Sequence, residues 1–339
     1  MHALAYEIIL GRDDKTREQL GLTGTILLGK HYVKMGQTTA LSQPVYLDLN
    51  KAHVVFVAGK RGSGKSYSLG VIAEGISQLP PEISRNLSVI LLDTMGIYWS
   101  MKYPNHQDEE LLKEWGQEGH AITQTKIYTP AGFYKHYKEQ GIPTDAPFSI
   151  KPSELAPEDW NLTFDITATD PIAVFIERII LDLKERGADY DIDDILQRIR
   201  SDEREEARVK QVAENRYIAV QAWGVFHKEA TPLKELAKGA QITILDLSCY
   251  AVLPNGWKIK HLVLGLVCSK LFIERMTARK MEEYETIASA VHYFAEEKEK
   301  EHMPLVWLMV DEAHEFLPNT GKTAATDALV ALLREGRQP

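Results

Sequence analysis

The sequence predicts an α/β fold that is built on a mostly parallel sheet. Continuous apolar runs such as "HVVFVAG" (53–59), "LSVILLD" (87–93) and "LVWLMV" (305–310) are typical of strands that are covered on both faces. Segments with helical spacing separate these runs, which favours parallel strands joined by helices. The 339 residues are enough for one large core or two modest ones.

Composition indicates an ordinary soluble globular protein, with 44% apolar and 26% charged residues and a net charge of −9. This charge argues against a broad basic surface for nucleic acid, although it leaves room for a local basic stripe or pore loop. The first residues do not resemble a signal peptide, and the longest apolar stretch is too short to span a bilayer. We therefore predict a cytoplasmic protein without a membrane partner. Cys249 and Cys268 form no CxxC pair, which favours small buried hydrophobes over a disulfide or zinc site.

Two regions are predicted in chain order. Residues 1–50 contain short alternating segments, "GTILLGKHYV" and "PVYLDLN", and predict a small β element. Residues 51–339 form the core, with a helical, heavily charged insertion at about 169–230. Within it, "RIRSDEREEARVK" (198–210) is interpreted as a solvated helix face, with a partner contact surface as the alternative.

The rest of the core continues the alternation. "TKIYTP" and "AQITILDLS" are predicted strands, and "HLVLGLVCSKLFIERMTARKMEEYE" is a long helix that is apolar first and charged later. The segment "AATDALVALLREGRQP" is a final predicted helix.

The segment from Gly59 to Ser66 fits the pattern G-x-x-x-x-G-K-[ST] between a predicted strand and a predicted helix. Its glycines let backbone N–H groups approach phosphate oxygens, and the following helix adds the positive end of its dipole. Lys65 is expected to reach the β- and γ-phosphates and to assist catalysis, and the Ser66 hydroxyl to ligate Mg²⁺. We predict a site for a nucleoside triphosphate, whose contacts are Gly59, Lys60, Arg61, Gly62, Ser63, Gly64, Lys65, Ser66, Tyr67 and Asp93.

Two adjacent acids follow the strand "LVWLMV". We predict that Asp311 holds Mg²⁺, directly or through water, and that Glu312 is the general base for the attacking water. Buried carboxylates are costly unless they are paired or bound to metal, so packing alone does not explain the pair. Hydrolysis of the nucleotide is therefore expected, rather than binding alone.

Three further residues are ambiguous. Asp93 ends another strand, where ligands gather in open α/β sheets, but a turn or cap Asp is an equal alternative. His314 and His53 could lie near a nucleotide, although a satisfied structural histidine is the preferred interpretation of each.

Several separated motifs together resemble the HerA-type ATPases of the HerA/FtsK branch: "HVVFVAGKRGSGKSYSLGVIAEG", "VILLDTMGIYW", "FSIKPSELAPEDW", "ITILDLS" and "VDEAHEFLP". The resemblance covers the chain from about Leu41 onward. It implies a RecA-like core, a hexameric homo-oligomer, Mg²⁺-dependent hydrolysis of ATP between subunits, and translocation of double-stranded DNA. It also implies a nuclease partner such as NurA, or an effector in defence against phage.

The sequence departs from this family in three places. Ile97 stands in "DTMGIY" where the family often has an acid, and the N-terminal β-barrel is abbreviated in residues 1–50. In the family, the helix at "LLREGRQP" leads into a further strand that lies between the phosphate-loop strand and the Asp311 strand. Without it two edges would be unpaired. We therefore expect that the natural polypeptide continues or that another segment fills the gap.

Arg334 and Arg337 are candidates for a charge-stabilising role in catalysis. They lie three residues apart, so on a helix both project from nearly the same face. A guanidinium can contact two oxygens of a transferring phosphoryl group, in its own subunit or a neighbour's. The alternative is that both arginines solvate the end of the helix.

Three hypotheses for function remain at this stage. The first is a ring-forming ATP-driven translocase of double-stranded DNA. The second is a related ATPase that moves protein, as in secretion or conjugation. The third is a non-motor assembly subunit whose oligomeric state is set by nucleotide. The acidic balance favours the second and third, and the motif set favours the first.

Overall fold

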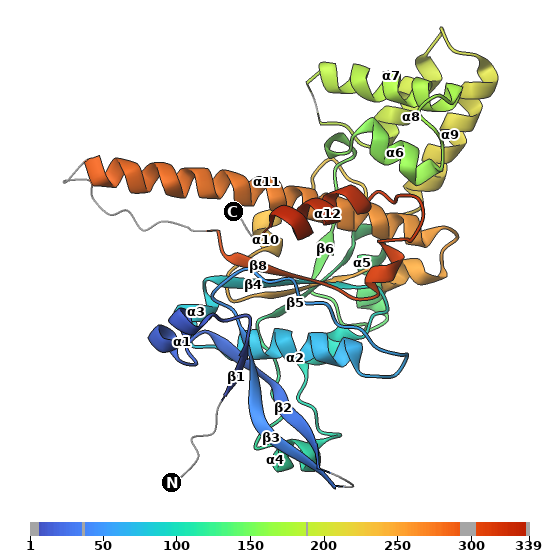
Figure 1. Ribbon diagram of the computed structural model, residues 1–339. Helices are drawn as coiled ribbons and strands as arrows, with labels where there is room; N and C mark the ends of the chain where they lie inside the picture. Colours follow the sequence, from blue (N-terminus) through green and yellow to red (C-terminus); the bar gives the residue numbers. More distant parts are fainter. Residues whose placement is uncertain (1–6, 36–37, 188, 292–302, 337–339) are drawn as a thin grey trace, which may run out of the picture.

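The computed structural model describes residues 7–35, 38–187, 189–291 and 303–336. Its centre is a five-stranded sheet, in the order β6-β5-β7-β4-β8, in which every neighbouring pair is parallel (Figure 1). The strands are β4 (Leu87–Asp93), β5 (Thr125–Pro130), β6 (Ala146–Phe148), β7 (Ile242–Asp246) and β8 (Leu305–Val310). The predicted α/β class with a parallel sheet is confirmed.

Helices connect and cover these strands. The α-helices are α1 (Asp14–Leu20), α2 (Lys65–Ser77), α3 (Pro81–Ser84), α4 (Glu109–Glu114), α5 (Ala131–Glu139), α6 (Pro157–Phe164), α7 (Pro171–Glu185), α8 (Ile192–Ser201), α9 (Ala207–Gln221), α10 (Leu233–Leu236), α11 (Gly256–Val291) and α12 (Thr326–Glu335). The short 3₁₀ helices are η1 (Tyr98–Lys102), η2 (Pro152–Glu154), η3 (Ser248–Val252) and η4 (Ala313–Glu315).

Strand β4 shows how the sheet is buried on both faces. Ile90 and Leu92 belong to the larger core cluster, which also contains residues of α11 and α12. Val89 and Leu91 belong to a second cluster, which contains residues of α2 and of the N-terminal sheet. Successive side chains of a strand point to opposite faces, so a continuous apolar run is what this position requires. Figure 1 shows α2 on one side of the sheet and α11 and α12 on the other.

A small three-stranded sheet precedes the core. It consists of β1 (Ile8–Leu10), β2 (Thr25–Met35) and β3 (Thr38–Asp48), in the order β1-β3-β2. It lies against α2, where a Cβ on Gly75 would be 3.0 Å from the Ile26 side chain. The boundaries that we predict for the two regions stay a prediction.

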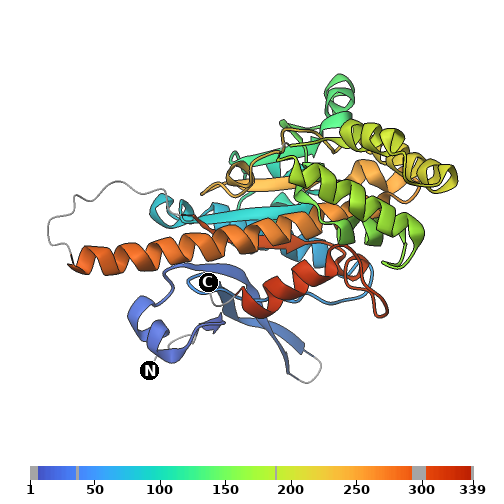
Figure 2. The ribbon, with the colours of Figure 1, turned by 90° about the horizontal axis from the view of Figure 1, so that it is seen from above.

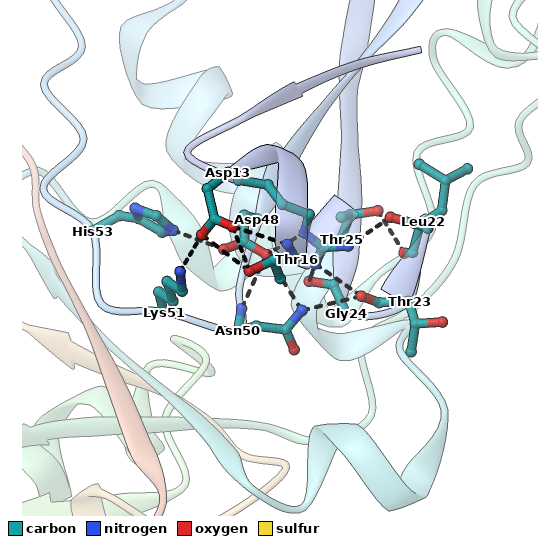
Figure 3. Close-up of polar contacts among 12 residues, drawn as sticks. Asp13, Thr16, Leu22, Thr23, Gly24, Thr25, Asp48, Asn50, Lys51 and His53 are labelled. Atoms are coloured by element: carbon teal, nitrogen blue, oxygen red, sulfur yellow. Dashed lines mark hydrogen bonds and ion pairs between the residues drawn. The ribbon is translucent and has the colours of Figure 1, made fainter. Parts of the chain in front are cut away.

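A buried polar network joins this sheet to the segment that leads to the phosphate loop (Figure 3). Arg12 Nε donates to Asp48 Oδ1 at 2.9 Å, and His53 Nε2 lies 3.1 Å from Asp48 Oδ2. Burial would raise the pKa of Asp48, but the hydrogen bonds from Arg12 and His53 outweigh it and lower the pKa. His53 is therefore a satisfied structural histidine, as preferred from the sequence.

The charged run at 198–210 differs from the prediction. It is no continuous helix face, because α8 ends at Ser201 and α9 begins at Ala207. Asp202 is buried at the turn between them and accepts hydrogen bonds from the backbone N–H groups of Arg204 and Glu205. The sequence pattern did not indicate this turn, because Asp202 lies in a run of charged residues and cannot be distinguished there from a solvated side chain.

The prediction of a buried strand at 53–59 is wrong. The structure assigns no strand there, and Val54, Val55 and Phe56 are 46, 42 and 83% exposed. A strand needs a neighbour that satisfies its N–H and C=O groups, and no described strand pairs with this segment. Strand β8 pairs with β4 and, among the described residues, with no second strand. Among the described residues, β8 therefore has an unpaired edge where we expected one without an intervening strand.

Helix α11 is the longest helix, with 36 residues. Its first half is buried in the larger core cluster, whereas its second half extends beyond the sheet in both views (Figures 1 and 2). No helix in the described ranges is both long and apolar enough to cross a membrane. Cys249 and Cys268 are free and buried, and burial raises the pKa of each thiol to about 12, so they behave as small hydrophobes.

Candidate nucleotide-binding site

The loop from Gly59 to Gly64 leads directly into α2, as predicted. Gly62 and Gly64 have φ angles of 76° and 86°, in the left-handed region that favours glycine. A Cβ on Gly59 would lie 2.3 Å from Ser63 Oγ, so a side chain at this position would have to displace the Ser63 hydroxyl. The backbone is therefore shaped as a cradle at the positive end of a 13-residue helix.

Lys65 lies over this cradle. It is the first residue of α2, and its Nζ donates a hydrogen bond to the carbonyl of Lys60 at 3.2 Å. Lys60, Arg61 and Tyr67 are exposed around the same loop. The structure therefore places residues 59–67 together on one loop and the start of α2, with the ammonium group of Lys65 against the loop backbone. Contact of these residues with a phosphate stays a prediction.

Tyr98 connects the start of α2 to the end of β8. Its hydroxyl donates to Asp311 Oδ2 at 3.0 Å and lies 3.3 Å from the carbonyl oxygen of Ser66. Tyr98 and Asp311 are both only 4% exposed. Burial, followed by the neighbouring Asp311 carboxylate, raises the pKa of Tyr98, so the phenol remains protonated. The two residues predicted to hold Mg²⁺ therefore lie on either side of one buried hydroxyl group.

Asp93 organises the loop that carries Tyr98. Its carboxylate accepts hydrogen bonds from the backbone N–H groups of Met95 (3.2 Å), Gly96 (2.7 Å) and Tyr98 (2.9 Å). Burial raises the pKa of Asp93 despite these donors. The contacts are those of the turn-aspartate alternative, and direct contact of Asp93 with nucleotide stays a prediction.

Glu312 has an unusual backbone conformation, with φ 54° and ψ 44°. Left-handed geometry is disfavoured for a residue with a side chain and is concentrated at functional sites. Its Oε2 lies 3.3 Å from Nδ1 of His314, whose side chain is 77% exposed. Asp311 Oδ1 accepts the N–H of Glu312 at 2.9 Å, so the two predicted acids share one turn.

The structure describes only one of the two arginine candidates. Arg334 lies in the last turn of α12 and is exposed. Arg337 lies outside the described residues. No described contact tests either role, and both roles remain predictions.

The oxygen atoms near Tyr98 fit a small hard cation. Asp311 uses one lone pair of each carboxylate oxygen on Tyr98 and Glu312, and the remaining lone pairs are free to accept. Oxygen ligands of this kind, completed by water and by substrate phosphates, suit Mg²⁺. The described residues include no cluster of three or more His, Cys, Asp or Glu that would form an all-protein metal site.

A phosphate cradle at a helix start, together with a buried acid at the end of a nearby parallel strand, defines a P-loop nucleoside triphosphatase. Residues 30–256 match the family described as "Helicase HerA, central domain". This match covers more than half of the chain, so the protein belongs to the HerA family of P-loop ATPases, and the resemblance predicted from the motifs is confirmed.

The sequence and fold also match solved structures. VirB4 of Thermoanaerobacter pseudethanolicus matches with a TM-score of 0.38 and 13% sequence identity, over 97% of this chain and 83% of VirB4. No curated protein matches the sequence significantly.

Sequence reasoning did not identify Tyr98. The signal is present in "DTMGIYW", where a tyrosine follows Asp93 by five residues and stands next to Ile97. Ile97 itself is 43% exposed. The bond between Tyr98 and Asp311 spans 213 positions in the sequence, and no local pattern reveals it.

Proposed function

We propose that this ATPase is one subunit of a ring-forming motor, most simply a hexamer, that moves double-stranded DNA in the cytoplasm. The observation that carries the proposal is the family assignment over residues 30–256, because the family is described as a helicase. The cradle before α2 and the Asp311 carboxylate supply the means of ATP hydrolysis that such a motor requires.

Each residue of the site has a role in this proposal. The backbone of residues 59–64 and the ammonium group of Lys65 bind the phosphates of ATP. The Ser66 hydroxyl and Asp311 hold Mg²⁺, which when bound neutralises charge on the phosphates. Tyr98 orients Asp311 through its hydrogen bond. Glu312 accepts the proton of the attacking water.

The ring supplies the remaining group. Arg334 ends α12 on the surface, where a neighbouring subunit can reach it. A guanidinium delivered to a phosphoryl group is worth about 10³–10⁵ in rate. Arg334→Ala should therefore depress turnover, and mixing it with Lys65→Ala subunits should restore part of the activity if the arginine acts in trans. Arg337 is the alternative donor.

A nuclease, or an effector of phage defence, is the proposed partner.

The test is ATP hydrolysis with and without a double-stranded DNA of fixed length, measured at several salt concentrations. Contacts to DNA phosphates release counterions, so the DNA concentration for half-maximal stimulation should rise steeply with salt. Lys65→Ala should abolish both the basal and the stimulated rate. A basal ATPase that DNA does not change at any salt concentration would exclude DNA as the cargo.

A second candidate is an ATPase that moves protein. The net charge of −9 favours it, because a surface of this sign repels DNA. A non-motor assembly subunit is the third, and the same charge favours it. The protein motor requires turnover that an unfolded protein substrate stimulates. The assembly subunit requires a change of oligomeric state with nucleotide but no stimulation by either polymer.

A further inference from the structure

The first two turns of α11 contact the loop that carries Glu312. Lys260 and His261 are adjacent in the second turn, and they are 5 and 4% exposed. Lys260 is the one lysine that is buried in the described part of the chain. A buried ammonium group is costly unless polar partners compensate it, so its partners indicate why it is there.

Lys260 connects the loops that follow two neighbouring strands. Its Nζ donates a hydrogen bond to the carbonyl of Thr94 at 3.2 Å, and it lies 3.9 Å from Glu315 Oε2. Thr94 directly follows Asp93 at the end of β4, and Glu315 lies three residues after Glu312. The ammonium group therefore spans the gap between the Asp93 loop and the Glu312 loop.

His261 contacts the same loop through other groups. The His261 ring packs edge-on against Phe316 at 5.4 Å between centroids. Trp257, one turn earlier in α11, packs edge-on against the His261 ring at 5.0 Å between centroids. Phe316 is fully buried. Two adjacent residues of one helix thus contact this loop, Lys260 at the Glu315 side chain and His261 at Phe316.

We propose that Lys260 and His261 are positioning residues for ATP hydrolysis, which fix the loop 311–316 and thereby the carboxylate of Glu312. Glu312 contacts little that would orient it, since its described partner, His314, is itself 77% exposed. Its left-handed backbone is stable only if the residues around it determine the turn. The clamp on Glu315 provides that constraint from α11. The inference rests on the proposed role of Glu312 as the base.

The test compares Lys260→Met with Lys270→Met. Lys270 lies on the same helix, and its Nζ is 2.7 Å from Glu154 Oε1. This ion pair does not involve the Glu312 loop, so Lys270 serves as the control. Displacing a catalytic group by about 1 Å can cost about 10²-fold in rate. We expect Lys260→Met to lower kcat for ATP by about 10- to 100-fold while the Kd of a fluorescent ATP analogue changes less than about twofold. Lys270→Met should leave both quantities at the wild-type values.

Glu315→Gln keeps the experiment decisive if Lys260→Met does not fold, because Glu315 is only partly buried. Alone it should lower kcat in the same direction, and the double variant should be no slower than the slower single variant, since both break one contact. Thermal melts establish the folded fraction. Wild-type kcat in folded Lys260→Met, or additive losses in the double variant, would overturn the positioning role. If Glu312→Gln loses activity while Lys260→Met keeps it, the positioning role of Lys260 is wrong and the role of Glu312 as the base still stands.

Discussion

Tyr98→Phe is the sharpest test of the candidate metal site. The substitution removes one oxygen atom and keeps the shape of a side chain that is only 4% exposed. It breaks the hydrogen bond to Asp311 Oδ2 at 3.0 Å and the contact with the Ser66 carbonyl at 3.3 Å. The backbone bond from Tyr98 to Asp93 is untouched, so the loop should keep its course.

The size of the effect follows from the charge on Asp311. A hydrogen bond to a charged group contributes about 1.5–3 kcal/mol to the orientation of that group. This corresponds to about one to two orders of magnitude in an equilibrium constant. Loss of a residue that orients a metal ligand typically costs about 10–100-fold in metal affinity. We therefore expect the Mg²⁺ concentration for half-maximal ATPase activity to rise about 10- to 100-fold.

The assay is steady-state ATP hydrolysis titrated with Mg²⁺ at a fixed, saturating ATP concentration. Tyr250→Phe is the matched control, because Tyr250 is also fully buried and its hydroxyl donates to the Trp223 carbonyl at 2.9 Å, away from the site. Both variants should lose stability, but only Tyr98→Phe should shift the Mg²⁺ dependence. Identical Mg²⁺ titrations for the two variants would refute the assignment of Asp311 as a metal ligand that Tyr98 orients.

Three further outcomes are expected. Lys65→Ala should largely abolish binding of a fluorescent ATP analogue with an unchanged circular dichroism spectrum, and retained affinity would contradict the phosphate-loop assignment. Glu312→Gln should bind ATP and Mg²⁺ normally but hydrolyse ATP about 10²-fold or more slowly; wild-type turnover would remove Glu312 as the base. Burial lowers the pKa of His261, which faces Lys260 and Glu315, from 6.5 to about 4. The unfolded chain therefore binds the extra proton between these values, and folding stability should fall by about 1.4 kcal/mol per pH unit as pH drops from about 6.5 to about 4. When the free energy of unfolding is measured by urea denaturation at several pH values, His261→Gln should lose less stability per pH unit than the wild type in this window. An equal pH dependence in both proteins would disprove the lowered pKa of His261.

The sequence predicted most of the sheet correctly because its strands are buried on both faces. Before their final aspartates, "LSVILLD" and "ITILD" contain only one polar residue each, Ser88 and Thr243, and both are fully buried. A pattern of this kind depends on local composition alone. The order of the strands is a different kind of information, since β4 pairs with β7 across more than 150 residues.

The segment at 53–59 has the same apolar pattern and no strand. Apolar alternation tells which residues avoid water, but a strand also requires a neighbouring backbone at hydrogen-bonding distance. No described strand pairs with this segment. Prediction from pattern therefore failed where pairing, rather than burial preference, decides the structure.

The candidate site was predictable in its parts but not in its connections. The cradle and the two strand-end acids were identified because glycine, lysine and carboxylate have specific chemical uses. The bonds from Asp93 to the Tyr98 backbone and from Tyr98 to Asp311 depend on which strands lie side by side. The order of the strands in the sheet determines these contacts, and the residue types alone do not predict them.

These connections explain why three acids can lie together at the carboxyl ends of β4, β7 and β8. Asp93 and Asp246 are register partners, and their repulsion is one of the causes that raise the pKa of Asp93. Each carboxylate is satisfied by backbone N–H groups of its own loop, as Asp246 is by Ser248 at 2.9 Å. These N–H groups therefore compensate part of the cost of burying the carboxylates. Among the described contacts of these three acids, only the Asp311 carboxylate is hydrogen-bonded to a side chain from another strand's loop. Tyr98 therefore links the Asp93 loop directly to Asp311, beside the link that Lys260 makes from Thr94 to Glu315.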